Sequence, residues 1–134
     1  MALQYSVSVR NARLDQVEST VGTAPLLQLF TGSAPANCAA ADSGTKLAEL
    51  TLPSDWMAAA SSGTKAKSGT WSGTAIANGT VAHFRIKDST GTTCHAQGTV
   101  TITGGGGDMT VDNTSIATSQ AVTVSSFTLT AGNA

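Results

Sequence analysis

Residues 69–103 read GTWSGTAIANGTVAHFRIKDSTGTTCHAQGTVTIT, and this stretch decides the fold. Two turn signals divide it, Asn78-Gly79 and the four residues from Asp88 to Gly91. Asn-Gly is typical of a two-residue type I′ turn, and a loop that begins with Asp and ends with Gly suits a type I turn closed by a glycine bulge. The stretch therefore predicts a three-strand antiparallel meander over residues 70–77, 80–87 and 92–103.

The two turns predict registers that agree on one apolar face. The first turn places Gly73 opposite Phe84, and the second places Ala96 opposite Phe84, so small residues flank the ring on both sides. Because a shift of one residue would move every side chain to the other face, this agreement favours the meander. The expected core face is Trp71, Gly73, Ala75, Ala82, Phe84, Ile86, Cys94, Ala96, Gly98, Val100 and Ile102. The opposite face, expected to meet water or a partner, carries Ser72, Thr74, His83, Arg85, Lys87, His95, Gln97, Thr99 and Thr101.

Residues 6–21 have the apolar spacing of a helix, and Gly22 supplies a stop signal. The apolar stripe consists of Val7, Leu14, Val17 and Val21. Because the segment holds several β-branched residues, we expect the helix to depend on docking against the sheet. A strand over residues 4–9 is the alternative for its beginning.

Further strands are expected at residues 26–30, 46–52, 109–112 and 121–131. In the last strand, the large apolar residues are even-numbered up to Val124 and odd-numbered from Phe127 on. This change predicts a bulge at Ser125-Ser126. Residues 31–44 and 54–68 are expected to be irregular, and the first segment has Asp42 as its single charged residue. A loop as long as the first is usually functional or mobile. The glycine run at residues 104–107 is expected to form a flexible joint.

These elements predict one mainly β domain over residues 1–134, with about seven or eight strands and one N-terminal helix. An antiparallel sandwich or jelly-roll-like barrel is the expected closure, because it leaves few free strand edges.

Composition argues against charge-driven functions. Charged residues make up 11% of the chain, against about 25% in an ordinary soluble domain. Seven Lys and Arg face eight Asp and Glu, so we expect neither nucleic acid nor an anionic membrane as a partner. The first residues lack a basic region followed by an apolar run, and we expect synthesis in the cytoplasm.

The reactive residue types do not form a recognisable catalytic or metal-binding pattern. His83, His95 and Arg85 share the predicted outer face, where a small acid–base or metal cluster competes with plain solvated polarity. Asp108, Asp112 and Asn113 match no calcium loop, and we interpret them as loop residues. We therefore expect no catalytic residues, no metal and no cofactor.

The chain contains two cysteines, Cys38 and Cys94. Two are too few for a disulfide framework, so we expect reduced, buried thiols, with a single bridge between them as the alternative. Trp56 lies in an irregular stretch, where a large aromatic side chain either plugs the core or anchors an interface.

The pattern as a whole resembles the small virion structural proteins of tailed bacteriophages, and the head decoration (cement) proteins in particular. The residues that carry the resemblance are Tyr5-Ser6, Arg10-Asn11 and Arg13-Leu14 in the helix, residues 29–32, residues 47–53, residues 82–91 with Phe84-Arg85-Ile86, and residues 122–132, which end in Gly132 followed by Asn133.

The resemblance implies an antiparallel β domain that forms a homo-oligomer, a dimer or trimer, on the capsid exterior and clamps neighbouring major capsid protein subunits. It carries over no catalytic or ligand residues. The interface candidates are Trp56, Met57, Tyr5 and Arg10.

Two other functional classes stay open. A tail or fibre protein that binds a receptor would gather aromatic side chains at one loop end. A carbohydrate-binding module is disfavoured because the chain holds only six aromatic residues, and the core claims several of them.

Overall fold

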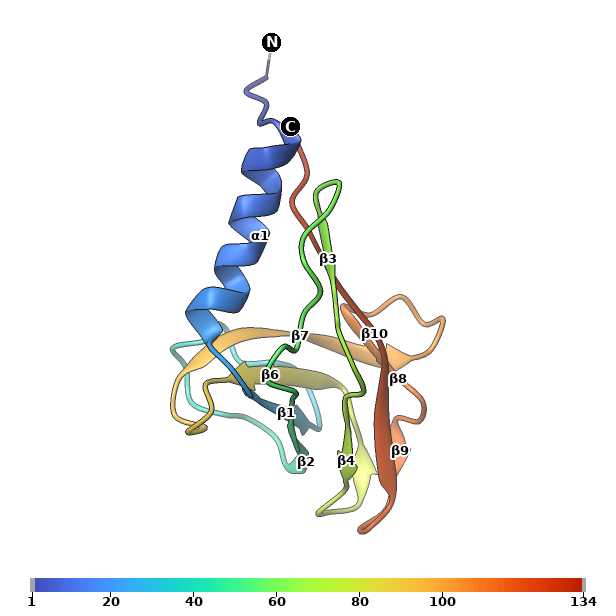
Figure 1. Cartoon of the computed structure of the whole chain (residues 1–134). Helices are drawn as coiled ribbons and strands as arrows, with labels where there is room; N and C mark the ends of the chain where they lie inside the picture. Colours follow the sequence, from blue (N-terminus) through green and yellow to red (C-terminus); the bar gives the residue numbers. More distant parts are fainter. Residues whose placement is uncertain (1, 134) are drawn as a thin grey trace.

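The computed structural model describes residues 2–133, which form one helix and ten strands (Figure 1). The elements in chain order are α1 (Val7–Val21), β1 (Leu26–Phe30), β2 (Lys46–Thr51), β3 (Thr64–Ala66), β4 (Ser72–Thr74), β5 (Gly79–Thr80), β6 (His83–Lys87), β7 (Cys94–Ile102), β8 (Met109–Val111), β9 (Ser115–Ile116) and β10 (Ala121–Thr130). Within these residues, no helix combines the length and apolarity that crossing a membrane requires.

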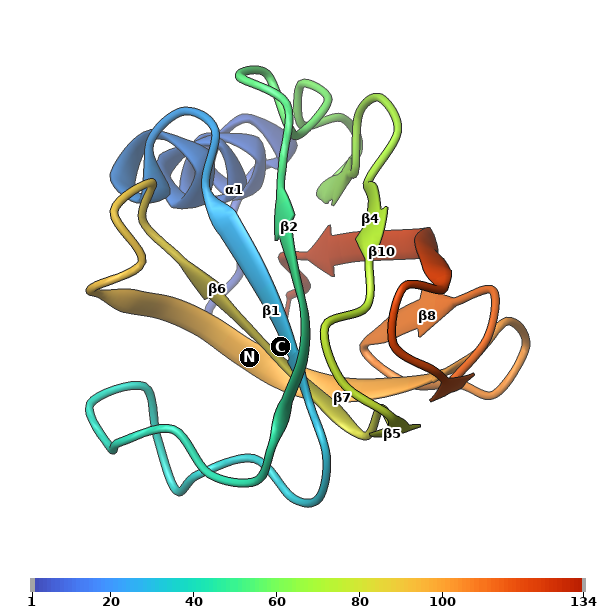
Figure 2. The same ribbon diagram turned by 90° about the horizontal axis from the view of Figure 1, so that it is seen from below.

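The main sheet has the strand order β2-β1-β6-β7-β8-β10-β3, and β4 also pairs with β10. Its pairings are antiparallel except for the one between β7 and β8. The sheet curls into a half-barrel (Figure 2), and β5 and β9 form a separate two-stranded sheet. The mainly β class with one N-terminal helix is confirmed, although a single curled sheet takes the place of the two layers of a sandwich.

The helix begins and ends where the sequence predicts. The Ser6 hydroxyl accepts a hydrogen bond from the Val9 amide, and the Gly22 amide donates to the Glu18 carbonyl. Leu14 and Val21 are buried against the sheet, but Val7 is 47% exposed. The reason is that the first turns of α1 project beyond the sheet, beside the C-terminal end of the chain (Figure 1).

The strands predicted outside the meander are present, whereas β3 lies within residues 54–68, which the sequence predicts to be irregular, and β9 is an additional short strand. The bounds of β1 are those expected, and Ala48, Leu50 and Leu52 are buried. The register of β10 shifts between Val124 and Ser126, which confirms the bulge. This long strand pairs with β4 along its first part and with β3 along its last part.

The prediction of the first hairpin of the meander is wrong. Gly73 of β4 lies opposite Val122 of β10 rather than opposite Phe84. The Asn78 side chain accepts hydrogen bonds from the amide and hydroxyl of Thr118 instead of supporting a tight turn. The preference of Asn-Gly for a hairpin is a local effect, and pairing with distant strand edges outweighs it.

Those distant pairings close one end of the half-barrel. The Ala75 amide donates to the Gln120 carbonyl beside β10, and the Ile76 amide donates to the Leu47 carbonyl of β2. A side chain at Gly73 would place its Cβ 2.9 Å from the Leu50 Cγ atom, so only glycine lets this segment cross so closely over β2.

The second hairpin is confirmed, with its register displaced by two residues. Phe84 faces Gly98 and Ile86 faces Ala96. Because a shift of two residues preserves the face, Phe84, Ile86 and Val100 are buried as predicted. Ile102 is 53% exposed, against expectation, because it lies at the end of β7 where the chain turns away.

A bulge between Ile86 and Lys87 places Lys87 opposite Cys94. It moves Cys94 off the apolar face and turns His95 toward the helix, where it lines a hollow with Arg13 and Val17. The predicted place of Cys94 in the core is therefore wrong.

Four aromatic rings form the centre of the core. Trp56, Trp71, Phe127 and Phe84 follow one another with ring centroids 5.9, 5.6 and 5.6 Å apart. The Trp56 Nε1 group donates to the Gly22 carbonyl at 3.0 Å, which ties the end of α1 to the core. Trp56 therefore plugs the core.

The glycine run forms an exposed turn that is hydrogen-bonded back to the end of β7. Residues 103–108 return the chain from β7 to the parallel strand β8. The Gly107 amide donates to the Thr101 hydroxyl at 2.9 Å, and a Cβ on Gly105 or Gly107 would lie less than 3.0 Å from that side chain. Gly104 and Gly106 have φ values of +85° and +82°, which favour glycine.

Candidate functional site: a slot between two strand edges

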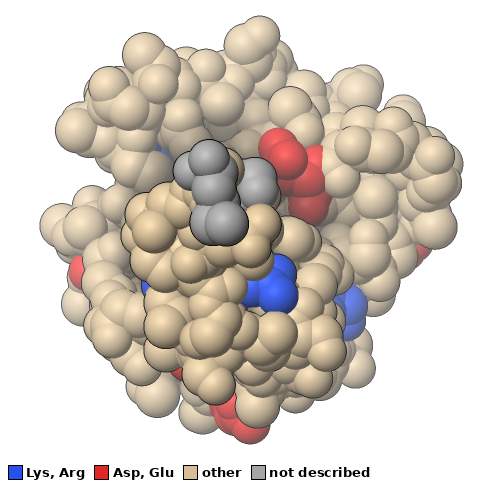
Figure 3. All heavy atoms as spheres, turned by 90° about the horizontal axis from the view of Figure 1, so that it is seen from above, with Lys and Arg blue, Asp and Glu red and all other residues tan. Residues whose placement is uncertain are grey.

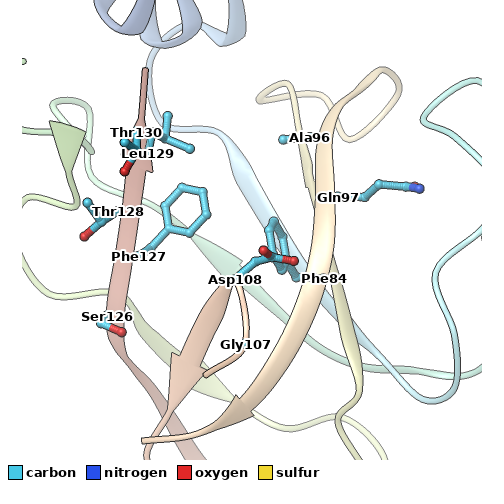
Figure 4. A pocket seen from close by; sticks show the side chains of 10 residues that line it. All are labelled: Phe84, Ala96, Gln97, Gly107, Asp108, Ser126, Phe127, Thr128, Leu129 and Thr130. Carbon is cyan, nitrogen blue, oxygen red and sulfur yellow. The ribbon is translucent and has the colours of Figure 1, made fainter. Parts of the chain in front are cut away.

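A cavity of about 440 Å³ forms a slot between β7 and β10 (Figure 4). It is lined by Phe84, Ala96, Gln97, Gly107, Asp108, Ser126, Phe127, Thr128, Leu129 and Thr130. We call this cavity the β7–β10 slot.

Strand β8 shows how wide the slot is. Thr110 of β8 pairs with Thr101 of β7 on one side and with Ser126 of β10 on the other, so one strand fills the space between them. At this level β7 and β10 lie two strand spacings apart, about 9–10 Å. Because β8 begins only at Met109, the slot continues its line without a strand in it.

On the β10 side, backbone groups are directed into the slot. The Phe127 carbonyl and the Ala131 amide form hydrogen bonds with residues beside β3. Backbone groups alternate in direction along a strand, so the N–H and C=O groups of Thr128 and Thr130 point the opposite way, into the slot. Both residues are exposed.

On the β7 side, the same alternation holds. The Val100 amide donates to the Ala82 carbonyl on the β6 side, which directs the amides of Thr99 and Gln97 toward the slot. The Thr99 amide donates to the Asp108 carboxylate at 2.9 Å, so this carboxylate stands where a strand carbonyl would bind. The Thr99 hydroxyl donates to the same Asp108 oxygen.

The floor of the slot is aromatic. The rings of Phe84 and Phe127 meet edge to face with centroids 5.6 Å apart (Figure 4). Backbone donors and acceptors on both sides and an apolar floor suit one short extended peptide. Such a peptide would pair with β7 and β10 in line with β8. The slot is made of backbone edges, so no residue pattern in the sequence could have indicated it.

A second exposed feature is the tip formed by the start of α1 and the residues before it. Leu3, Tyr5, Val7 and Val9 are 70%, 43%, 47% and 42% exposed. The Asn133 side chain exchanges two hydrogen bonds with the Tyr5 backbone, which holds both chain ends at this tip. Viewed from the side of the tip, Lys, Arg, Asp and Glu are isolated spots on an uncharged surface (Figure 3).

The interface candidates are divided between surface and core. Tyr5 lies at the tip with the Arg13 guanidinium 5.4 Å from its ring centroid. Arg10 is half-buried and donates to the Ala131 carbonyl at 3.3 Å. Trp56 and Met57 are each 1% exposed, because the core cluster surrounds them, and neither presents a side chain to a partner.

The predicted outer face of β6 does not meet solvent. His83, Arg85 and Lys87 are 1%, 2% and 7% exposed, because residues 31–44 cover them (Figure 2). His83 stacks on Phe30 and forms a 2.7 Å hydrogen bond through Nδ1 with the Gly32 carbonyl. The sequence-based interpretation of this face as solvated is wrong for these three residues.

Asp42 of the covering loop forms ion pairs with two buried cations. Its carboxylate accepts hydrogen bonds from Arg85 and, at 2.8 Å, from Lys87. Burial opposes ionisation of Asp42, but the hydrogen bonds from Lys87 and Arg85 outweigh it and hold the pKa below its usual value. The Cys38 carbonyl also accepts from Arg85 at 2.8 Å, so the loop is held by its own backbone as well.

The remaining candidates serve as local supports. His83 and His95 are not brought together, since the bulge turns His95 to the helix side. Asp112 and Asn113 each accept a hydrogen bond from a nearby backbone amide. Among residues 2–133, no group of three or more His, Cys, Asp or Glu side chains is placed to hold a metal ion.

Comparison of the chain with protein-family models, with curated proteins and with solved structures found no match.

Proposed function

We propose that the chain is a structural protein that binds other protein subunits, with the β7–β10 slot receiving an extended segment of its partner. The observation that carries this proposal is the pair of open strand edges that face each other across the slot. An added strand would gain backbone hydrogen bonds from both edges, including those of Thr128, Thr130 and Gln97. Alternate side chains of that strand would rest on Phe84 and Phe127.

The partner that we propose is the major capsid protein of a tailed bacteriophage, as the resemblance of the sequence to head decoration proteins implies. The weakly charged surface supports contact with a protein lattice, because few ions lose their water on binding. The protein would sit on the capsid exterior and stabilise the shell.

The tip supports self-association as a dimer or trimer. Its four exposed apolar side chains are of the kind that subunit contacts bury. In such an oligomer, several weak slots act together through effective concentration, so each one needs only modest affinity.

The aromatic residues favour this proposal over the alternatives. A receptor-binding tail protein or a carbohydrate-binding module would gather exposed aromatic side chains at one loop end. Trp56, Trp71, Phe84 and Phe127 lie in the core, and Phe30 is also buried. Tyr5 alone among the six is exposed.

Electron microscopy of phage heads assembled with and without the protein tests the proposal. We expect regular density on the capsid exterior and weaker heads when the protein is omitted. Thr128→Pro removes an N–H group that faces the slot, whereas Thr128→Val keeps the N–H and nearly the same shape. The proline variant should lose occupancy on heads and the valine variant should keep it. Density confined to the tail, or equal occupancy by both variants, would contradict the proposal.

A further inference from the structure

The loop of residues 31–44 and strand β7 enclose a polar cavity of about 280 Å³. Cys38 of the loop and Cys94 of β7 both line it, together with Arg85 and Asp42. These cysteines are separated by more than fifty residues in the sequence, yet they lie on the walls of one small cavity. Both are free thiols and half-buried.

The two thiols are close enough to interact. Burial, and after it the neighbouring Cys94 thiol, raise the pKa of the Cys38 thiol to about 11, although the positive charge of Arg85 acts in the opposite direction. This influence of one thiol on the other agrees with the position of both cysteines in the lining of one cavity. The loop already lies over β6 and β7 through the Arg85–Asp42 pair and the bond from Gln97 to the Pro35 carbonyl, so the fold keeps both cysteines at this cavity.

We propose that Cys38 and Cys94 are a site of reversible disulfide formation, which fastens the loop of residues 31–44 to strand β7. The oxidant is a low-molecular-weight disulfide such as oxidised glutathione. One cysteine thiolate attacks the small disulfide, forms a mixed disulfide and releases one small thiolate. The other cysteine thiolate then attacks the protein sulfur of the mixed disulfide and releases the second small thiolate. The two cysteines lose two protons and two electrons, and the small disulfide is reduced to two thiols.

The cross-link would hold the loop of residues 31–44 over the buried cations that it covers. Arg85 and Lys87 remain buried only while residues 31–44 cover them. A bond from Cys38 to Cys94 restricts the opening of this cover and constrains the unfolded chain by closing a long loop. Oxidation should therefore stabilise the protein and slow exchange of amides beneath the loop.

The experiment equilibrates folded, reduced protein with glutathione buffers of increasing oxidising strength and then measures mass, free thiols after unfolding, and Tm. We expect both thiols to disappear together, the mass to fall by two hydrogen atoms, and the chain to stay monomeric on a non-reducing gel. The Tm should rise by roughly 5–15 °C and return after reduction. Peptide mapping should join the peptides that contain Cys38 and Cys94.

Cys38→Ser and Cys94→Ser are the controls. Each should retain one thiol, gain at most one glutathione, and show no comparable rise in Tm. The proposal rests on the wild-type result, so it is decided even if a serine variant folds poorly. Two thiols that remain free in strongly oxidising buffer, or oxidation only to mixed disulfides or cross-linked dimers, would overturn it.

Discussion

The outer face of β6 and the edges of the β7–β10 slot differ in what the sequence indicates about them. The face carries His83, Arg85 and Lys87, residue types that suggest a surface for water or partners, yet the loop of residues 31–44 covers it. The slot shows no distinctive residue pattern, yet it leaves the strand edges at Thr128 and Gln97 open. Side-chain polarity is therefore a poor guide to exposure where a long loop can supply partners, and backbone edges are visible only in the fold.

Substitutions at the buried outer face of β6 should reduce folding stability more than substitutions at the slot. Asp42→Ala removes the carboxylate shared by Arg85 and Lys87 and leaves two buried cations without their counter-ion. We expect a loss of about 3 kcal/mol, at the lower end for a broken buried pair, because the Asp42 side chain is itself 39% exposed and the Cys38 carbonyl still accepts from Arg85. Chemical denaturation measures this change. Lys46→Ala is the control, since Lys46 and Glu49 form an exposed pair and its loss should cost under about 1 kcal/mol. Equal effects of the two substitutions would mean that the loop does not cover the face.

A methyl group on the slot side should have a smaller effect. A Cβ at Gly98 would lie 2.8 Å from the Asp108 Oδ2 atom and 2.9 Å from the Phe84 Cε1 atom. We expect Gly98→Ala to cost roughly 1–3 kcal/mol, because the ring and the carboxylate must move. Gly132→Ala is the matched control, since nothing lies within 4 Å of the added carbon. Thermal unfolding distinguishes them, and an unchanged Gly98→Ala protein would contradict the register that places Gly98 opposite Phe84.

The stability that Asp42 contributes to the folded protein should depend on pH. The pKa of Asp42 is lowered in the folded protein from its usual 3.8, so the stability contributed by this carboxylate is fully present above that value. It is lost as the pH falls through the folded pKa. We expect wild type to be more stable than Asp42→Asn at neutral pH, and the difference to shrink below pH 3.8. Denaturation at several pH values measures the difference, and a difference that grows in acid would reverse the sign assigned here.

Much of the fold follows from local signals in the sequence. The spacing of Leu14, Val17 and Val21 predicts the docked face of α1, and the parity switch after Val124 predicts the bulge in β10. The second hairpin holds because its turn joins strands that are neighbours in the sheet. Where the prediction failed, distant pairing decided the structure, as at Asn78-Gly79, whose neighbours are joined to β2 and β10.

The candidate sites were harder to predict for the same reason. The bulge between Ile86 and Lys87 is set by strand pairing, and it moves both Cys94 and His95 to unexpected faces. The sequence does not decide between core and interface for Trp56, and only the fold shows that it packs against Trp71 within the core cluster. Tyr5 is the exposed aromatic residue because the start of α1 projects beyond the sheet.

Residue-resolved hydrogen exchange tests the slot most directly. In the isolated protein, the amides of Thr128 and Thr130 should exchange quickly, whereas the Ala131 amide, which donates to the Gly63 carbonyl, should exchange slowly. On decorated heads, the amides of Thr128 and Thr130 should become protected as the partner strand pairs with them. Equal protection of all three amides in the isolated protein, or rapid exchange of Thr128 and Thr130 on fully decorated heads, would contradict an open slot that a partner strand fills.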